Sequence, residues 1–441
     1  MNVVRIAALT MALGPVVLSG QTAGTPWVTP TAAEVAAVYP DSESLYIDLH
    51  RNPELAFQET QTAAKLAARM RALGFEVTTG VGRTGVVAVL RNGPGPTVML
   101  RTEIDALPIA EKTGLPFASA VVSKTADGLT TPVMHACGHD LHMAAWAGTA
   151  RVMADHRDRW RGTLLLVGQP AEETLGGASA MLTDGLFTRF PRPAFALSLH
   201  DDDTMPAGTI GYHPGFFRAM SDAVTITVFG RGGHAAMPQN TIDPIVLAAR
   251  IVVALQTVVA RETSPTDPVV VTVGSIHGGS AGNVIPDEVR LQLSVRTYTP
   301  EVRTRTLAAI RRIARGEALA AGAPREPEVD APAQGNALVF NDPATTLRLA
   351  TALKKGLGDE KVVEMPQKMT SEDFAEYGLA GVPSVLLHIG AVEPARLAAA
   401  RQAGVPIPAP HSPEWVPALE PTLKGAIRAE VTALLELLRP N

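Results

Sequence analysis

Two short segments combine side chains that can hold a metal ion. Residues 134–140 place Cys137, the only cysteine of the chain, two residues before His139. Further along, an apolar run is followed by two adjacent carboxylates, Glu172 and Glu173. Thiolate, imidazole and carboxylate are ligands of transition metals, and neighbouring carboxylates can divide the holding of metal and the movement of protons. The sequence therefore predicts hydrolysis with bound metal.

Cys137 has two other interpretations. A lone cysteine is most often a small buried apolar residue, and a cysteine can also be a nucleophile beside a histidine base. If Cys137 were a nucleophile, the carboxylates of Glu172 and Glu173 would have no role in the reaction. Gly138, by contrast, lets the backbone turn so that Cys137 and His139 can face one ion. These neighbours favour a metal ligand.

Length and composition limit the class of protein. A chain of 441 residues is too long for one ordinary core, so two domains are expected. A hydrophobic content of 46% with 18% charged residues is typical of a folded globular protein. The net charge of −5 and the lack of a basic stripe argue against a nucleic-acid partner.

The first residues have the pattern of an export signal. Residues 1–5 carry one positive charge, residues 6–18 are apolar, and small residues follow. A signal peptide over residues 1–25 predicts a periplasmic or secreted protein if it is cleaved, and a cytoplasmic one otherwise; a disordered extension is the alternative. No later segment approaches the length of a membrane span, so we expect no stable span in the mature chain.

Helix and strand patterns alternate along most of the chain. They predict an α/β catalytic domain, residues 26–214 and 331–441, with a mixed sheet covered by helices. Residues 215–330 follow the order of a ferredoxin-like α+β domain, which we expect as an inserted lid. The clearest strands are expected at 85–90, 97–100, 163–167, 195–199 and 384–388, and the clearest helices at 57–73, 140–153, 243–261, 300–319 and 423–438.

Polar residues follow three of the expected strands. Asp105 follows one strand, Glu172 and Glu173 follow another, and His200 ends a third. Ligands of open α/β sheets gather beyond the carboxyl ends of the strands. We therefore expect these residues to meet in one crevice, where Asp105 could orient a ligand histidine. His411 lies between prolines in a stiff loop, but a lone loop histidine is by itself a weak candidate.

The lid contains three further candidates. His234 lies in a glycine-rich segment after a strand, Asn283 lies in a loop, and Arg296 follows an alternating strand. Arginine and asparagine can together recognise a carboxylate. A flexible hairpin with an exposed histidine fits the same pattern, so spacing alone assigns these residues no role.

Taken together, the motifs resemble the dinuclear-metal aminoacylase and carboxypeptidase superfamily, in particular its branch of hippurate hydrolases and auxin–amino acid conjugate hydrolases. The resemblance runs from about residue 40 to the C-terminus, with the motifs in the family's order. The matching segments are DLHRNPEL (48–55), DALP (105–108), HACGHD (135–140), QPAEE (169–173), GGHAA (232–236), NVIP (283–286), SEDF (371–374) and HSP (411–413).

The resemblance implies a site for two divalent metal ions. Zinc, manganese, cobalt and nickel all tolerate such ligands. Cys137 would take the bridging position that an aspartate has in other branches. The implied ligands are Cys137, His139, Glu173, His200 and His411.

The resemblance also implies roles for residues that do not bind metal. Glu172 would be the general base, and Asp105 would orient a ligand. His234 would reach the active site of the partner subunit, in a homodimer formed through the lid, and stabilise the oxyanion. Asn283 and Arg296 match lid positions that grip the carboxylate of the substrate.

Residue 103 departs from the family pattern. The family commonly has an aspartate where this chain has Glu103, which leaves the ligand geometry and the metal preference open. His200 is followed by three aspartates, an acidic rim that bears on substrate choice.

These features predict a metal-dependent amidohydrolase that cleaves an N-acyl-amino acid or a similar small-molecule amide. A dipeptidase or carboxypeptidase of the same superfamily is the alternative, and it differs in whether the acyl side needs a free amine. A non-catalytic binding protein that kept the fold is the alternative from another class. Such a protein has no need of the base Glu172, which argues against it.

Overall fold

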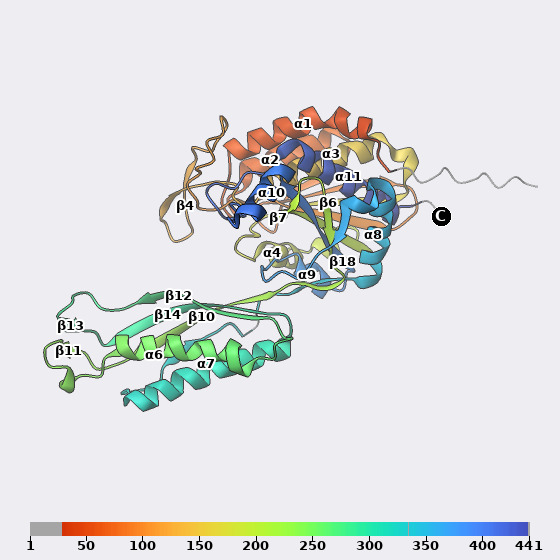
Figure 1. Ribbon diagram of the computed structural model, residues 1–441. Helices are drawn as coiled ribbons and strands as arrows, with labels where there is room; N and C mark the ends of the chain where they lie inside the picture. The colour runs from red at the N-terminus through yellow and green to blue at the C-terminus, as the bar shows by residue number, and fades with distance from the viewer. Residues whose placement is uncertain (1–28, 334, 440–441) are drawn as a thin grey trace, which may run out of the picture.

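The computed structural model describes residues 29–333 and 335–439, so the signal expected at 1–25 lies outside the described residues. Figure 1 shows two bodies of unequal size joined by extended segments. Two of these segments, β9 (Gly215–Arg218) and β16 (Val339–Asn341), pair antiparallel, so the connections into and out of the smaller body run side by side. The domain boundaries expected from the sequence lie close to these two strands and stay a prediction.

The larger body is built on a mixed sheet. Its central strands β6, β3, β7 and β18 are parallel, β2 runs antiparallel to β1 and β6, and β8 runs antiparallel to β18 but parallel to β17. The expected mixed sheet is therefore confirmed. Within the described residues the sheet has eight strands, in the order β1 (Glu76–Val81), β2 (Gly85–Asn92), β6 (Gly162–Gln169), β3 (Thr97–Glu103), β7 (Phe195–Pro206), β18 (Ser384–Val392), β8 (Ile210–Tyr212) and β17 (Val362–Glu364).

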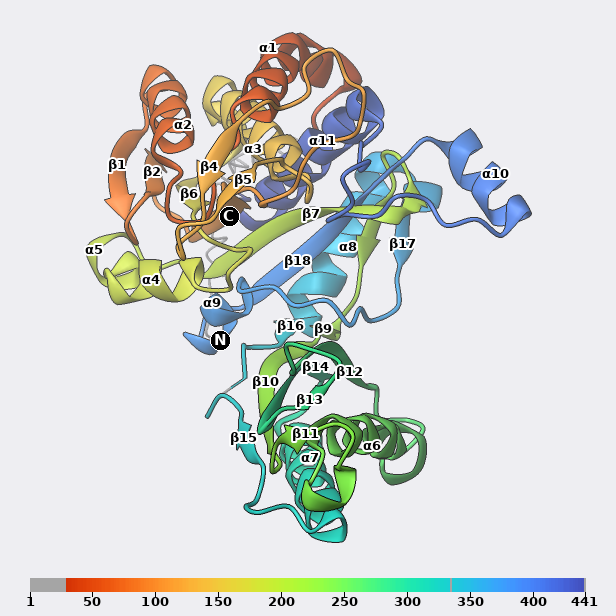
Figure 2. The ribbon, with the colours of Figure 1, turned by 90° about the vertical axis from the view of Figure 1, so that its left-hand side faces the viewer.

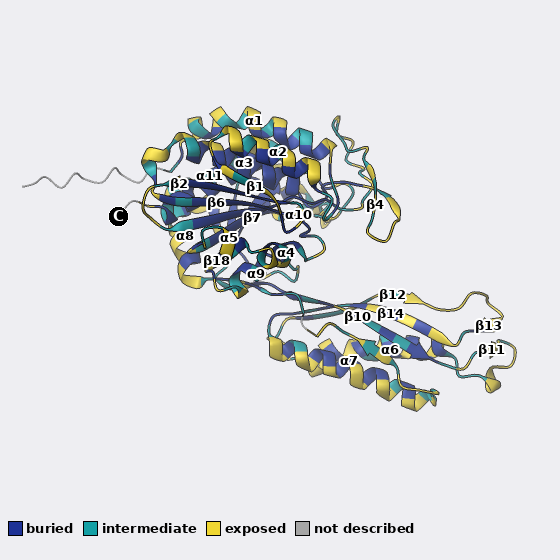
Figure 3. Ribbon diagram, turned by 180° about the vertical axis from the view of Figure 1, so that it is seen from behind, coloured by how far each residue is buried: buried dark blue, intermediate teal, exposed yellow. Residues whose placement is uncertain are grey.

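Helices cover both faces of this sheet, and Figure 3 shows its buried strands in dark blue beneath helices with exposed outer faces. One face packs against α1 (Ala32–Arg51), α2 (Thr60–Ala72), α3 (His139–Asp155), α8 (Pro343–Leu357) and α11 (Leu419–Leu437). The other face packs against α4 (Gly177–Thr183), α5 (Leu186–Arg189) and α9 (Ala375–Leu379). The hairpin of β4 (Val122–Lys124) and β5 (Thr130–Pro132) and the helix α10 (Pro394–Ala403) lie outside these layers.

The central strand β7 extends far beyond its expected end. β7 continues to Pro206, so the expectation that His200 ends a strand is wrong. The aspartates after His200 had the composition of a loop, but they continue the ladder with β18, where Asp201 pairs with Ile389. His200 and His388 are register partners inside this ladder.

The smaller body is the inserted lid, a ferredoxin-like domain as expected. Its strands lie in the order β12 (Val269–His277), β14 (Glu288–Thr297), β10 (Met220–Phe229) and β15 (Glu328–Asp330). The helices α6 (Pro244–Thr257) and α7 (Pro300–Ala321) pack on one face of this sheet. A two-stranded ladder of β11 (Gly233–His234) and β13 (Val284–Ile285) forms the end of the lid farthest from the larger body (Figure 1).

One lid helix is more apolar than the sequence analysis expected. The segment Pro244–Glu262, which is α6 with the π-turn that follows it, has the length and composition of a membrane span, with a mean hydropathy of 1.7. In the structure, Leu247, Ile251 and Leu255 pack into the core of the lid. On other faces Val246 is 57% and Val253 is 72% exposed.

Candidate active site

The expected crevice exists where the parallel strands end. It is a cavity of about 460 Å³ between the larger body and the lid strand β14. Figure 2 shows the lid below the larger body, with β10 leading from one to the other. The lining residues are Cys137, Glu172, Glu173, Leu175, His200, Asp201, Asp203, Arg218, Arg296, Lys368, Thr370, Ser371, His388, Ala409, Pro410 and His411.

A glycine turn brings Cys137 and His139 together, as the sequence indicated. Gly138 has φ +76°, and a Cβ atom at this position would lie 2.4 Å from Oδ2 of Asp201. Only glycine satisfies both conditions without strain. His139 then begins α3, and the ligand atoms of Cys137, His139 and His200 lie within 4.8 Å of one another.

Backbone carbonyls set the orientation of both histidines. Nδ1–H of His139 donates to the carbonyl of Asp105, and Nδ1–H of His200 donates to the carbonyl of Asp201, each over 2.8 Å. The lone pair is therefore left on Nε2 in both rings. Nε2 of His200 lies 3.6 Å from Sγ of Cys137. Nε2 of His139 is buried without a hydrogen-bond partner among the described residues.

The two glutamates follow β6 in a strained turn. Ala171 has φ 52°, which is uncommon for a residue with a side chain. Nε2 of His139 lies 3.9 Å from a carboxylate oxygen of both Glu172 and Glu173. Asp105 steadies this turn, because its Oδ2 accepts the backbone N–H of Glu173 over 3.0 Å.

His411 reaches the same place from a distant loop. Its φ is 70°, and its backbone N–H donates to the carbonyl of Ala136 over 2.7 Å, which ties the loop to the Cys137 turn. Nε2 of His411 lies 3.3 Å from Oε2 of Glu173. The ligand atoms of Cys137, Glu173 and His411 also lie within 4.8 Å of one another. The structure thus gathers the other four ligand candidates around Cys137.

The electrostatics of this cluster fit divalent cations. Burial, with the carboxylates of Glu173 and Asp201 beside it, raises the pKa of the Cys137 thiol well above its usual range. A nucleophilic thiolate needs electropositive surroundings, whereas a bound cation deprotonates a thiol directly. Burial raises the pKa of Glu172 well above its usual range, as do the carboxylates of Glu372 and Glu173. Burial also raises the pKa of Glu173 to about 7, against the lowering effect of His139. Bound cations would offset this repulsion.

Glu103, the residue that departs from the family pattern, pairs with side chains outside the five ligand candidates. It pairs with Arg101 through one oxygen, and its other oxygen accepts Nδ1–H of His142 over 3.1 Å. His142 uses its second nitrogen too, because Nε2 accepts the backbone N–H of Asp201 over 2.8 Å. Burial would raise the pKa of Glu103, but Arg101 and His142 hold it well below its usual range. Glu103 therefore supports the elements behind the ligands.

The lid candidates separate into two places. Arg296 lines the cavity, and its Nη1–H donates to the hydroxyl of Ser371. His234 and Asn283 lie at the far end of the lid, where the backbone N–H of Ala235 donates to the carbonyl of Asn283 over 3.1 Å. Both side chains are exposed. Within one chain, therefore, the structure does not bring His234 or Asn283 to the cavity.

Sequence reasoning gave no role to five polar residues of the cavity wall, although one of them, Ser371, lies in the matching segment SEDF. These residues are Arg218, Lys368, Thr370, Ser371 and His388. Arg218 left a visible signal, because it is the one charged residue in the run from Gly215 to Met220. A charge in an otherwise apolar run has to be paired or functional.

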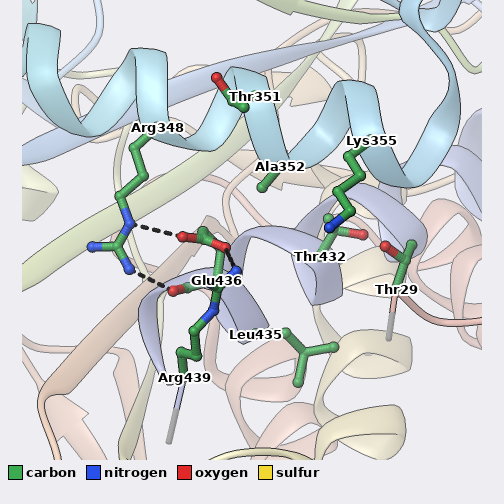
Figure 4. Close-up of a pocket in the computed structure, with 9 residues that line it drawn as sticks. All are labelled: Thr29, Arg348, Thr351, Ala352, Lys355, Thr432, Leu435, Glu436 and Arg439. Atoms are coloured by element: carbon green, nitrogen blue, oxygen red, sulfur yellow. Dashed lines mark hydrogen bonds and ion pairs between the residues drawn. The ribbon is translucent and has the colours of Figure 1, made fainter. Parts of the chain in front are cut away.

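A separate hollow lies between α8 and the end of α11 (Figure 4). Its lining residues are Thr29, Arg348, Thr351, Ala352, Lys355, Thr432, Leu435, Glu436 and Arg439. Within this lining, Nε–H of Arg348 donates to Oε1 of Glu436 over 2.9 Å. These lining residues include no thiol or imidazole, so the hollow lacks the donor set of the Cys137 cluster.

Comparisons with known proteins agree with the fold and the cluster. Residues 99–404 match the family described as Peptidase family M20/M25/M40. The chain is 36% identical over 347 residues to a hippurate hydrolase of Campylobacter jejuni, covering 77% of this chain and 86% of that protein. It is 34% identical over 346 residues to thermostable carboxypeptidase 2 of Saccharolobus solfataricus, covering 78% and 84%. The crystal structure of a dinuclear-metal-binding M20 peptidase from Bacillus subtilis superposes with a TM-score of 0.72 at 30% identity, covering 91% of this chain and 99% of that one.

A mixed α/β sheet with an inserted lid, and a buried cluster of thiol, imidazole and carboxylate, define a metal-dependent hydrolase. The chain belongs to peptidase family M20/M25/M40, and it is a hydrolase of amide bonds that works with divalent metal.

Proposed function

We propose that the protein cleaves the amide bond of N-acyl-amino acids. The observation that supports this most is that Glu172 and four of the five ligand candidates line one cavity. Nε2 of the fifth candidate, His139, is buried beside them without a hydrogen-bond partner among the described residues. The similarity to a hippurate hydrolase, an enzyme named for an N-acyl-amino acid, supports the same substrate class.

Two divalent ions, zinc, manganese, cobalt or nickel, would be held by Cys137, His139, Glu173, His200 and His411. Cys137 belongs to both groups of close ligand atoms, one with His139 and His200 and one with Glu173 and His411, which is the position of a shared ligand. When bound, the ions supply polarisation of the amide carbonyl and a lowered pKa of water.

Glu172 moves the proton in this proposal. Its side chain is 7% exposed, and its carboxylate adjoins the ligand cluster without being needed in either group around Cys137. It takes a proton from the attacking water and delivers it to the leaving amine. Arg296 receives the carboxylate of the amino acid, because the partners of its guanidinium within the described part of the chain are two hydroxyls, on Ser294 and Ser371.

The proposed active unit is a homodimer formed through the lid. His234 and Asn283 are exposed at the far end of their own lid, away from the cavity of their own chain, and in this proposal they serve the cavity of a partner chain. β12 forms an edge of the lid sheet over nine residues, and long unprotected edges invite pairing. The adjoining helix α6 exposes Val246 and Val253. In the dimer, His234 of the partner subunit would stabilise the negative charge that develops on the carbonyl oxygen.

A carboxypeptidase is the second candidate, supported by the similarity to thermostable carboxypeptidase 2. Both kinds of enzyme bind the carboxylate of the leaving amino acid. They differ in whether the acyl side of the substrate needs a free amine. Turnover of N-acetyl- and N-benzoyl-amino acids well above that of the matching free dipeptides supports the amidohydrolase. The reverse order of rates supports the peptidase.

Metal removal should abolish hydrolysis. Prolonged chelation leaves Cys137 protonated and Glu172 with no activated water, so we expect activity on N-acyl-amino acids to fall to background. Adding back zinc, manganese, cobalt or nickel should restore it, with close to two ions per chain by mass spectrometry. Full activity in protein shown to be metal-free would refute the proposal.

We also propose that the protein is exported. The support is the N-terminal pattern of residues 1–25. N-terminal sequencing of protein from the native host should find the mature end near residues 20–26. An intact Met1 on protein from the cytoplasmic fraction would contradict export and leave the proposed activity untouched.

A further inference from the structure

Arg218 is a buried cation on the cavity wall, at the point where the chain leaves the larger body for the lid. It is 5% exposed, and its Nε has no hydrogen-bond partner among the described residues. Nη2–H donates to Nε2 of His388 over 3.1 Å, and Nη1–H donates to the carbonyl of Ser371 over 3.3 Å. Oε2 of Glu372 forms an ion pair with Nη1 at 3.9 Å, a distance beyond hydrogen-bond reach. Among the described residues, the guanidinium therefore has no hydrogen-bonded anion.

The neighbours of Arg218 hold it in place without neutralising it. His388 donates Nδ1–H to Oδ2 of Asp202 over 2.8 Å, so its Nε2 is a neutral acceptor for Arg218. Asp202 also forms an ion pair with Lys368. Lys368 faces the cavity as well, but its charge is already matched.

A second arginine lies on the same wall. Nη1–H of Arg296 donates to the hydroxyl of Ser371, whose carbonyl accepts from Arg218. Among the described residues no carboxylate lies within ion-pair distance of Arg296. The acidic residues that line the cavity are Glu172 and Glu173 in the ligand cluster and Asp201 and Asp203 on β7. Two arginines that contact one serine thus line the cavity, and neither has a hydrogen bond to a carboxylate among the described residues.

We propose that the preferred substrate has two carboxylates on its amino-acid side, as in N-acyl-glutamate or N-acyl-aspartate. Arg296 takes the α-carboxylate and Arg218 takes the side-chain carboxylate. A guanidinium can donate two parallel N–H bonds to one carboxylate. The two carboxylates of an acidic amino acid are separated by only a few carbon atoms, which suits two arginines that share Ser371. The inference rests on the proposed hydrolysis of N-acyl-amino acids and adds a specificity for acidic amino acids.

A purely structural role for Arg218 leads to a different expectation. Behind it, the buried Arg101 faces three carboxylates, and Arg218 could serve only to balance one of them, Glu372. Its loss would then weaken hydrolysis of every substrate by a similar factor and would lower stability.

Pairs of substrates that differ only in the side-chain charge test the proposal. The metal-reconstituted full chain is assayed with N-acetyl-glutamate against N-acetyl-glutamine, and with N-acetyl-aspartate against N-acetyl-asparagine. Because a charge-assisted hydrogen bond contributes about 1.5–3 kcal/mol, we expect kcat/KM to favour the acid about 10- to 100-fold. Arg218→Gln should lower kcat/KM for the acid and leave kcat/KM for the neutral amide unchanged, so that the ratio falls close to one. Arg218→Lys keeps the positive charge and should keep a preference for the acid.

Arg296→Gln is the matched control. It should lower kcat/KM for both members of a pair by a similar factor, because both have the α-carboxylate, and leave their ratio in place. The proposal is overturned if the wild-type protein cleaves the neutral member as well as the acid, or if Arg218→Gln lowers both equally. The ratio of kcat/KM for the acid to that for the neutral amide, measured on the wild-type protein, tests the proposal even if a variant fails to fold. If no N-acyl-amino acid is cleaved, the proposed function itself fails, and this inference with it.

Discussion

Replacing Glu172 by glutamine is expected to lower kcat by about 10²- to 10⁴-fold while the metal content stays unchanged. The amide keeps the size of the side chain but cannot accept a proton from water or return one to the leaving amine. Burial, followed by the charges of Glu372 and Glu173, raises the pKa of Glu172 and disfavours its ionised form, so a neutral replacement should be tolerated by the fold. Steady-state kinetics and mass-spectrometric metal analysis on one preparation provide the measurement.

Glu173→Gln is the control for this experiment. Glu173 contacts His411 at 3.3 Å and belongs to the group around Cys137, so its loss should reduce the number of ions bound per chain. The division of roles fails if the two variants lose metal to the same extent.

Two inactive variants are expected to restore activity when they are mixed. His234→Ala should reduce kcat by about 10²- to 10³-fold, because it removes one donor to the developing negative charge. In a heterodimer with Glu172→Gln, one cavity receives Glu172 from the first chain and His234 from the second. That heterodimer should approach about half of the wild-type rate per dimer if the two sites act independently.

The matched control is His234→Ala mixed with the double variant His234→Ala/Glu172→Gln. No cavity in that mixture has access to His234, so it should stay inactive. Subunit exchange has to be shown in both mixtures, for example with differently tagged chains. Exchange without recovery in the first mixture would mean that His234 acts within its own chain or has no role.

Periodic elements of the fold could be predicted from the sequence, and irregular ones could not. The expected helix at 300–319 is α7 (Pro300–Ala321), which begins at a capping threonine followed by proline and ends at a glycine with φ 67°. The helix α1 was missed, because Pro40 interrupts its pattern. β7 was cut short at His200 because aspartates rarely continue a strand. Here Asp201 and Asp202 are buried, and side chains from other elements pair with them.

The candidate site divides in the same way. Local spacing was enough for Cys137 and His139, because Gly138 alone lets them face one point. The position of His411 came only from the family resemblance, since its neighbours in the chain carry no signal. Arg218 was missed because its partners, His388 and Ser371, are more than a hundred residues away in sequence. Such contacts exist only in the folded chain.

Cys137 also determines how oxidants such as peroxide affect this protein. It is the only cysteine of the chain, so an oxidised sulfur has no resolving thiol within the molecule and would proceed from sulfenic to sulfinic acid, which is irreversible for most proteins. Because Cys137 belongs to both of the groups of ligand atoms that we propose for the two ions, one such event would weaken the binding of both. The sulfur is protected by its burial, at 6% exposure. In the metal-free protein the raised pKa of the thiol also keeps it protonated, and a thiol reacts with peroxide more slowly than a thiolate. Peroxide should therefore inactivate the protein slowly, and adding a thiol reductant and metal afterwards should not restore the lost activity.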